Sequence, residues 1–149
     1  MKTAIKIHII LLAFLGISAL GGGGALTISP SGKLLGGLPV SILKNSPFKD
    51  FFIPGIILFL VLGTVPCLVA FSLIKKTANK LAESLNFFKD MYWAWSFSIY
   101  IAFALIIWLQ TEMFLLQSVD WLHNFYMILA IVIILIALLP EVRNFYKKP

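Results

Sequence analysis

Residues 51–74 read FFIPGIILFLVLGTVPCLVAFSLI, without one charged side chain, and Lys75 and Lys76 follow directly. A helix needs about 20 apolar residues to cross the hydrocarbon core of a bilayer. Three other blocks have the same character: Ile7–Leu26, Met91–Leu109 and Trp121–Leu139. The sequence therefore predicts an all-α integral membrane protein, a bundle of four transmembrane helices in which residues 1–149 form a single transmembrane domain. The predicted spans are approximately 7–26, 51–74, 91–109 and 121–139.

The composition agrees with this class. Hydrophobic residues make up 60% of the chain and charged residues 12%, against roughly 45–50% and 25% in soluble domains. A net charge of +6 would suggest nucleic acid as a partner of a soluble protein, but here the lysines lie just beyond hydrophobic blocks, where anionic lipid headgroups are found. We expect the lipid bilayer as partner, with a protein partner or a homo-oligomer as further possibilities, and no nucleic acid.

The basic residues are distributed unevenly along the chain. Three lie between the first two blocks: Lys33, Lys44 and Lys49. The other nine lie at the N-terminus, between the second and third blocks, or in the tail: Lys2, Lys6, Lys75, Lys76, Lys80, Lys89, Arg143, Lys147 and Lys148. By the positive-inside rule, both termini are cytoplasmic. The predicted location is the bacterial inner membrane, with several passes.

The first block has a second interpretation. Met1 and Lys2 followed by an apolar run are also typical of a secretory signal peptide. We favour a retained helix, because the apolar character continues past Leu15 and no clean small-x-small cleavage site precedes the glycines. Gly21–Gly24 is then interpreted as the frayed end of the first helix, since glycine tolerates the left-handed conformation found there. Cleavage of residues 1–24 would leave the orientation of the rest unchanged, so both interpretations stay open.

Two connections are unusual in composition. The first, Thr27–Asp50, contains glycine and proline turn formers among many leucines, so we expect it to pack over the outer mouth of the bundle, unless it only joins two spans. The connection Lys75–Asp90 has apolar residues at helical spacing. These are Ala78, Leu81, Leu85 and Phe88, with Lys76, Lys80, Glu83 and Asn86 at the other positions. This pattern predicts a short amphipathic helix resting on the cytoplasmic leaflet.

Small residues inside the blocks predict close helix packing. They are Ala94, Ser98 and Ala102 in the third block, Ala19 and Gly23 in the first, and Gly63 in the second. Pro66 has no N–H to donate and is predicted to kink the second span.

A polar cluster is predicted at the outer end of the last two spans. It comprises Gln110, Thr111, Glu112, Gln117, Asp120, His123, Asn124 and Tyr126. A helix would present Asp120, His123 and Asn124 on one face. A carboxylate beside an imidazole could make the ring a proton acceptor or a partner for a quinone headgroup. Alternatively, Asp120 is a helix cap and His123 lies in water, which is the interpretation we favour.

Other chemical motifs are not found in the sequence. His8, near the inner end of the first block, is alone. The chain has one cysteine, Cys67, and neither a glycine-rich loop between a strand and a helix nor a nucleophile elbow. We therefore assign no catalytic residue, expect no metal and no cofactor, and regard an enzyme as the less favoured class.

Some motifs resemble a known group. They are Ser29-Pro30-Ser31-Gly32, Leu35-Gly36-Gly37-Leu38-Pro39, Ser46-Pro47-Phe48 and residues 50–55, together with Leu122-His123, Tyr126 and Leu139-Pro140 before Val142-Arg143. They are similar to a group of small uncharacterised bacterial inner-membrane proteins with four spans. More remotely, the size and the pattern of Gly55, Leu58 and Gly63 resemble the DoxX-like superfamily. That resemblance implies an association with quinone-linked redox complexes.

Three hypotheses for function follow. The leading one is a non-enzymatic structural or accessory component that packs against lipid or a partner protein. The second is a DoxX-like, quinone-linked redox accessory protein that binds quinone near His123 and Asp120. The third is a small-molecule transporter or channel that acts as an oligomer, because four short helices enclose little polar volume.

Overall fold

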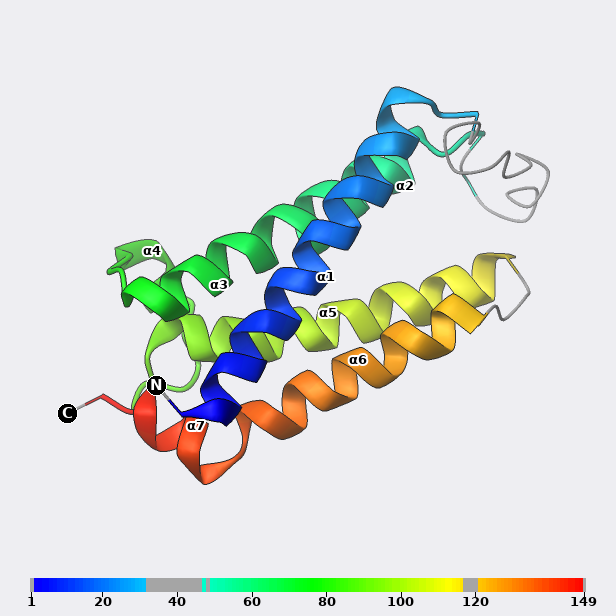
Figure 1. Cartoon of the computed structure of the whole chain (residues 1–149). Coiled ribbons are helices and arrows are strands. Elements are labelled where there is room, and N and C mark those ends of the chain that lie inside the picture. Colours follow the sequence, from blue (N-terminus) through cyan, green and yellow to red (C-terminus); the bar gives the residue numbers. More distant parts are fainter. Residues whose placement is uncertain (1, 32–46, 48, 117–120, 149) are drawn as a thin grey trace.

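The computed structural model describes residues 2–31, 47, 49–116 and 121–148 (Figure 1). Over these ranges the chain is mostly helical and forms no β-strand, apart from an isolated bridge between Met91 and Lys147. The elements are α1 (Thr3–Ile28), α2 (Phe52–Ile57), η3 (Leu58–Thr64), α3 (Val65–Lys75), α4 (Lys80–Ser84), α5 (Trp93–Leu116), α6 (Trp121–Ala137) and α7 (Pro140–Phe145). Because α2, η3 and α3 follow one another without a break, we call them together the composite helix.

Three helical stretches are long and apolar enough to cross a membrane: Thr3–Ile28, Phe52–Lys75 and Trp93–Phe114. The fourth predicted span corresponds to α6, an apolar helix of 17 residues. At 1.5 Å per residue it is about 26 Å long, slightly less than the hydrocarbon core. The prediction of a helical protein with several apolar helices is therefore confirmed, with three to four of them able to span a membrane.

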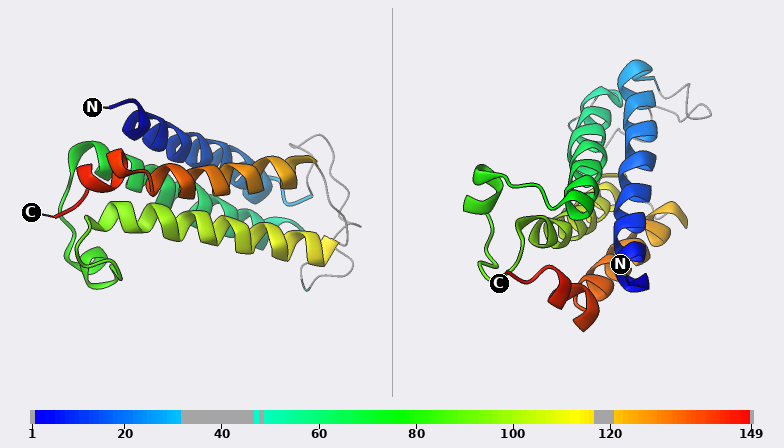
Figure 2. Two further views of the ribbon diagram at one scale, coloured as in Figure 1. Left: turned by 90° about the horizontal axis from the view of Figure 1, so that it is seen from below. Right: turned by 60° about the vertical axis from the view of Figure 1, so that its left-hand side comes forward.

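The helices are arranged as two antiparallel pairs (Figures 1 and 2). α1 packs along the composite helix, and α5 packs along α6. The pairs contact each other where α1 meets α6 and where α3 meets α5. Both chain termini, α4 and α7 lie at one end, which we call the terminal end. In Figure 1 the two pairs lie furthest apart at the opposite end, which we call the loop end.

The four consecutive glycines lie inside a helix, so the prediction that they form a frayed end was wrong. α1 continues through Gly21–Gly24 to Ile28, and the Thr27 hydroxyl donates a hydrogen bond to the Gly23 carbonyl. A Cβ atom on Gly23 would lie 2.5 Å from the backbone nitrogen of Phe59 and 2.7 Å from the carbonyl oxygen of Gly55. The helix continues because this close contact with the composite helix offsets the poor helix propensity of glycine.

Pro66 affects the composite helix, but the chain remains helical. The π-helical turn η3 ends two residues before the proline. The N–H of Val65 donates to the carbonyl of Leu60, and the Thr64 hydroxyl donates to the carbonyl of Phe59. A π-helical turn is one way in which a helix accommodates a missing backbone donor.

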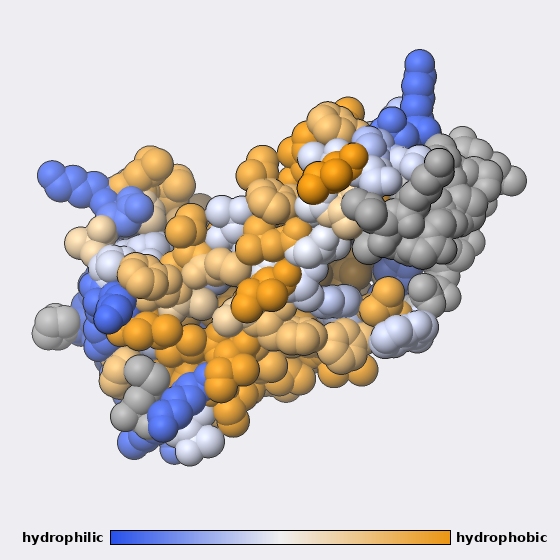
Figure 3. All heavy atoms as spheres, turned by 45° about the horizontal axis from the view of Figure 1, so that its top comes forward, coloured by the Kyte–Doolittle hydropathy of each residue, from blue (hydrophilic) through white to orange (hydrophobic). Residues whose placement is uncertain are grey.

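Apolar side chains cover the outside of the helices as well as their interior. Leu12, Leu73, Ala94 and Ile133 are fully buried, and Ala94 belongs to the predicted small-residue stripe, whose other members Ser98 and Ala102 are also fully buried. Exposed apolar residues include Ile10, Ile17, Leu68, Ile107, Ile128 and Leu135. Figure 3 shows hydrophobic residues over the middle of one face and hydrophilic residues towards the ends. Helices that are hydrophobic on all sides are typical of a lipid environment.

Candidate functional site

Glu112 and His123 are brought together at the loop end. The Nε2 atom of His123 lies 3.3 Å from an Oε atom of Glu112, within reach of a charge-assisted hydrogen bond. Glu112 is in the last turns of α5 and His123 is in the first turn of α6, so the pair links two neighbouring antiparallel helices. The His123 side chain is 10% exposed and that of Glu112 is 32% exposed. Trp108, one turn earlier on α5, adjoins the same carboxylate.

The other described members of the predicted cluster are more exposed than His123. Gln110 and Asn124 are exposed, and Tyr126 is half-buried against Phe125. Thr111 is exposed and its hydroxyl donates to the Ile107 carbonyl 2.8 Å away.

Two candidates, Gln117 and Asp120, lie outside the described residues. So does most of the connection Thr27–Asp50, which is predicted to pack over the outer mouth of the bundle (residues 32–46 and 48). The third block is longer than predicted: α5 runs to Leu116, past the predicted end at Leu109. The polar residues of 110–112 are therefore part of the helix, where Glu112 can face His123.

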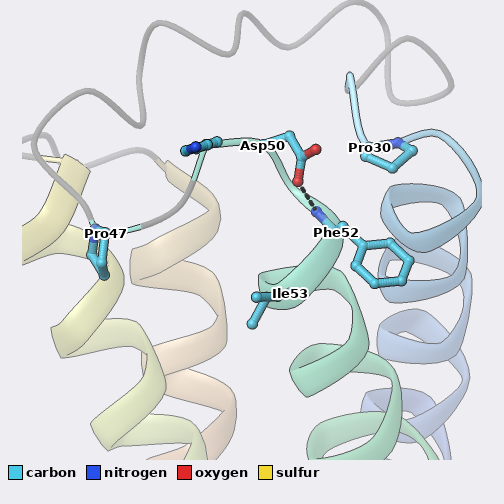
Figure 4. A pocket seen from close by; sticks show the side chains of 6 residues that line it. Pro30, Pro47, Asp50, Phe52 and Ile53 are labelled. Atoms are coloured by element: carbon cyan, nitrogen blue, oxygen red, sulfur yellow. Dashed lines mark hydrogen bonds between the residues drawn. The ribbon is translucent and has the colours of Figure 1, made fainter.

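A shallow hollow of about 420 Å³ also lies at the loop end. It is lined by Pro30, Pro47, Lys49, Asp50, Phe52 and Ile53. Figure 4 shows Pro30 and Phe52 on one side of it and Pro47 on the other. An Asp50 carboxylate oxygen accepts a hydrogen bond from the Phe52 N–H at 3.0 Å and thereby orders the start of α2. Glu112 and His123 do not line this hollow.

His8, predicted to be isolated, has a partner ninety residues away in the sequence. Its Nε2 atom lies 3.1 Å from the Ser98 hydroxyl, and both residues are fully buried. The Ser98 hydroxyl donates its own hydrogen to the Trp95 carbonyl, so it can only accept from His8, which fixes the Nε2–H tautomer. Nδ1 of His8 has no partner among the described residues. This pair joins α1 to α5 in the interior.

A hydrogen-bonded network at the terminal end was not predicted from the sequence. The Tyr146 hydroxyl donates to the Leu73 carbonyl at 2.9 Å, and the Tyr146 carbonyl accepts from the Tyr92 N–H at 2.7 Å. The Tyr92 hydroxyl and the Trp93 indole N–H both donate to the Thr77 carbonyl. The signal in the sequence is the position of these aromatic residues, with Tyr92 and Trp93 at the start of the third block and Tyr146 in the tail. Interfacial position alone does not reveal which carbonyl an aromatic residue will bind.

Burial influences the acidity of this network. Burial, with a smaller contribution from the nearby Tyr92, raises the pKa of Tyr146 to about 12. Burial also raises the pKa of Tyr92. A hydrogen bond from the Lys148 ammonium lowers the pKa of the Glu83 carboxyl. These groups hold the chain tail against the connection between α3 and α5, and we assign no catalytic role to them.

The chemistry available to the Glu112–His123 pair is limited. A carboxylate beside an imidazole orients the ring and can share a proton with it. Over residues 2–31, 47, 49–116 and 121–148, no three His, Cys, Asp or Glu residues are grouped so that they could hold a metal ion. The Glu112–His123 pair offers proton exchange or a polar contact to a ligand headgroup.

Fold and site together define a mostly helical protein with three to four apolar helices and, at the loop end, a pair of a buried histidine and a partly exposed glutamate. Comparisons with protein-family models, with curated proteins and with solved structures find no match. The resemblances to the four-span group and to the DoxX-like superfamily therefore remain predictions.

Proposed function

We propose that this protein is a structural or accessory component of the bacterial inner membrane, with four spans and both termini in the cytoplasm. The observation that carries the proposal is the combination of an apolar interior with apolar outer faces. Leu12, Leu62 and Ile133 fill the space between helices, and Ile17 and Leu68 face outward. Such a protein is suited to pack against lipid or another membrane protein.

The orientation is supported by the distribution of charge. The nine basic residues of the N-terminus, the connection between α3 and α5, and the tail all belong to the terminal end. Positive charge is favoured on the cytoplasmic side, where the leaflet is anionic. Fusion of a periplasmic-only reporter enzyme after residue 149 should therefore be inactive, and a cytoplasmic fluorescent reporter at the same point should be active.

The side chains between the helices support a transport function less than a structural one. Ser98 and Thr64 are two of the polar residues that a path through the helices would pass. The first is bound to His8 and the second donates to the Phe59 carbonyl. Leu12, Leu15 and Leu62 are fully buried nearby in the core. Proteoliposomes containing the purified protein are therefore expected to show no solute flux above empty vesicles.

A quinone-linked accessory role is the second candidate. It is favoured by the Glu112–His123 pair, since a buried imidazole held by a carboxylate is a suitable contact for a quinone carbonyl. The leading proposal gives this pair a packing role between α5 and α6. The two proposed functions predict different effects of removing the Glu112–His123 pair on membrane assemblies and on bound quinone.

The deciding experiment compares polar and packing variants in the native host. A deletion strain is profiled for its membrane assemblies by native gel and mass spectrometry, and then complemented. Under the structural proposal, Glu112→Gln and His123→Gln restore the profile and Gly23→Leu, which separates α1 from the composite helix, does not. Quinone that copurifies stoichiometrically with the wild-type protein but is lost from folded Glu112→Gln would contradict it and support the second candidate.

A further inference from the structure

The connection between α3 and α5 exposes large apolar side chains on the protein surface. Leu81 is 72% exposed, Leu85 54%, Phe87 84% and Phe88 40%. We call these four residues the apolar loop face. Contiguous exposed apolar groups mark a surface that contacts a partner or a membrane.

The backbone that carries this face is fixed by a buried amide. Asn86 is fully buried, although the sequence places it on the polar side of an amphipathic helix. Its Nδ2 group donates to the Met91 carbonyl at 2.8 Å and to the Glu83 carboxylate at 3.2 Å, and its Oδ1 atom accepts from the Phe88 N–H at 2.9 Å. A side chain with three such bonds holds the loop in one conformation.

The loop is also attached to the side of α5. The Phe87 N–H donates to the Tyr100 hydroxyl at 2.8 Å, and that hydroxyl donates to the Leu85 carbonyl at 3.1 Å. Phe87 contacts the Tyr100 ring edge-on, and Phe88 contacts the Trp95 ring in the same manner. The exposure of Phe87 is therefore a property of an ordered segment.

The position and charge of the segment identify what it contacts. α3 ends at Lys75 and α5 begins at Trp93, so the loop lies at the level where two apolar helices end. Figure 2 shows α4 projecting sideways from the other helices. Residues 75–90 carry more positive than negative charge, with Lys75, Lys76, Lys80 and Lys89 against Glu83 and Asp90. Apolar groups beside lysines match the boundary between the acyl chains and the phosphates of an anionic leaflet.

We propose that the apolar loop face inserts into the headgroup–acyl boundary of an anionic leaflet and that the surrounding lysines meet lipid phosphates. The inference rests on the membrane location given under the proposed function, and not on which side of the membrane the termini lie. It makes this connection a lipid-binding element in addition to a link between two helices.

The test measures the depth of position 87. Phe87→Cys, in a Cys67→Ala background, is labelled with an environment-sensitive fluorophore and reconstituted in phosphatidylglycerol nanodiscs. Nitroxide lipids labelled at shallow and deep positions are compared with aqueous iodide as quenchers. The expected depth is roughly 5–10 Å below the headgroups, with little quenching by iodide. In phosphatidylcholine nanodiscs, and in a Lys80→Gln/Lys89→Gln variant, the probe should lie closer to water.

Two reference positions separate the possible failures. A probe at Phe103→Cys, exposed in the middle of α5, should be quenched by the deep nitroxide, and one at Lys147→Cys by iodide. If Phe103 contacts lipid while Phe87 is open to iodide, the inference is wrong and the membrane location stands. If Phe103 is also open to iodide, the membrane location itself fails. If the probe at position 87 were protected from all quenchers, another part of a protein would cover it. If its depth did not depend on lipid charge, anionic lipid would not be its specific partner. Either result would overturn the inference.

Discussion

The α1–composite helix interface and the terminal end hold the helices together by different means. In the first, backbones approach closely at glycines: Gly16 faces Gly63 and Cys67, and Gly23 faces Gly55. At the terminal end, large aromatic residues donate hydrogen bonds to carbonyls at helix ends or just beyond them. These include Tyr146 to Leu73, Trp95 to Ala137, and Tyr92 and Trp93 to Thr77.

The difference follows from the surroundings that each region is predicted to have. Between helices in lipid there is little hydrophobic driving force, so association depends on close van der Waals packing. Near the membrane surface, aromatic side chains combine an apolar body with a polar tip, which lets them satisfy carbonyls that a helix leaves without donors. We therefore expect steric changes to dominate in the first region and single hydrogen bonds to have moderate effects in the second.

The largest effect should come from adding one methyl group at Gly23. In Gly23→Ala the new Cβ would lie 2.5 Å from the Phe59 nitrogen, and a backbone atom cannot move aside as a side chain can. We expect the free energy of unfolding to fall by about 1–3 kcal/mol. Reversible denaturant unfolding of the detergent-solubilised protein, followed by circular dichroism, measures it.

Gly21→Ala is the matched control within the same glycine run. A Cβ at this position would have no neighbour within 4 Å. The substitution should leave stability unchanged or raise it by up to about 1 kcal/mol, because alanine has the higher helix propensity. A similar gain in stability in both variants would show that helix propensity, and not contact with the composite helix, governs this segment.

The Gly21–Gly24 segment also shows what could be predicted from the sequence. The hydrophobic blocks predicted the helices to within a few residues at most ends, because apolar length is a local property. Whether a helix continues through glycines depends on Gly55 and Phe59, which lie far along the chain. The same limitation applies to His8, whose partner Ser98 was interpreted only as a packing residue.

The candidate site was predicted in part. Glu112 and His123 both belonged to the predicted cluster, but the sequence suggested Asp120 as the carboxylate beside the imidazole, because it lies one helical turn away. The pairing with Glu112 requires the antiparallel register of α5 and α6, which hydrophobic periodicity does not specify. Asn86 illustrates the same point, since its burial depends on the loop path between Glu83 and Met91.

A moderate effect is expected at Tyr146, the most buried of the aromatic donors. Tyr146→Phe removes the hydrogen bond to the Leu73 carbonyl and should lower the free energy of unfolding by about 1 kcal/mol. The pKa of the folded tyrosine is about 12, whereas an unfolded tyrosine ionises near pH 10, roughly its ordinary value. Between these values the unfolded state binds fewer protons, so stability falls as pH rises.

The stability of Tyr146→Phe should therefore fall less than that of the wild-type protein between pH 10 and 12, which are roughly the ordinary and the raised pKa values of tyrosine. Part of the fall should remain, because the pKa of Tyr92 is also raised. Denaturant unfolding at neutral pH and at a pH between the two pKa values measures the difference. Tyr126→Phe at the loop end serves as the comparison and should keep the full decrease. If stability depended on pH in the same way in the wild-type protein, Tyr146→Phe and Tyr126→Phe, the Tyr146 hydroxyl would not be buried in the fold.

The smallest effect is expected for the ion pair between Lys148 and Glu83, which joins the tail to α4. Both side chains are more than one-third exposed, and solvent-exposed pairs contribute about 0–1 kcal/mol, reduced further by salt.

The pKa of Glu83 is lowered, chiefly by the hydrogen bond from Lys148. The stabilisation is thus present above the ordinary pKa of glutamate and is lost as pH falls through the lowered value. Lys148→Gln should lower the free energy of unfolding by at most about 0.5 kcal/mol at neutral pH and should have no effect in acid. The backbone N–H of residue 148 still donates to the Asp90 carbonyl in this variant, so the tail keeps that attachment. A loss as large as that of Gly23→Ala would reverse the comparison, because an exposed charge pair would then contribute as much as the glycine contact.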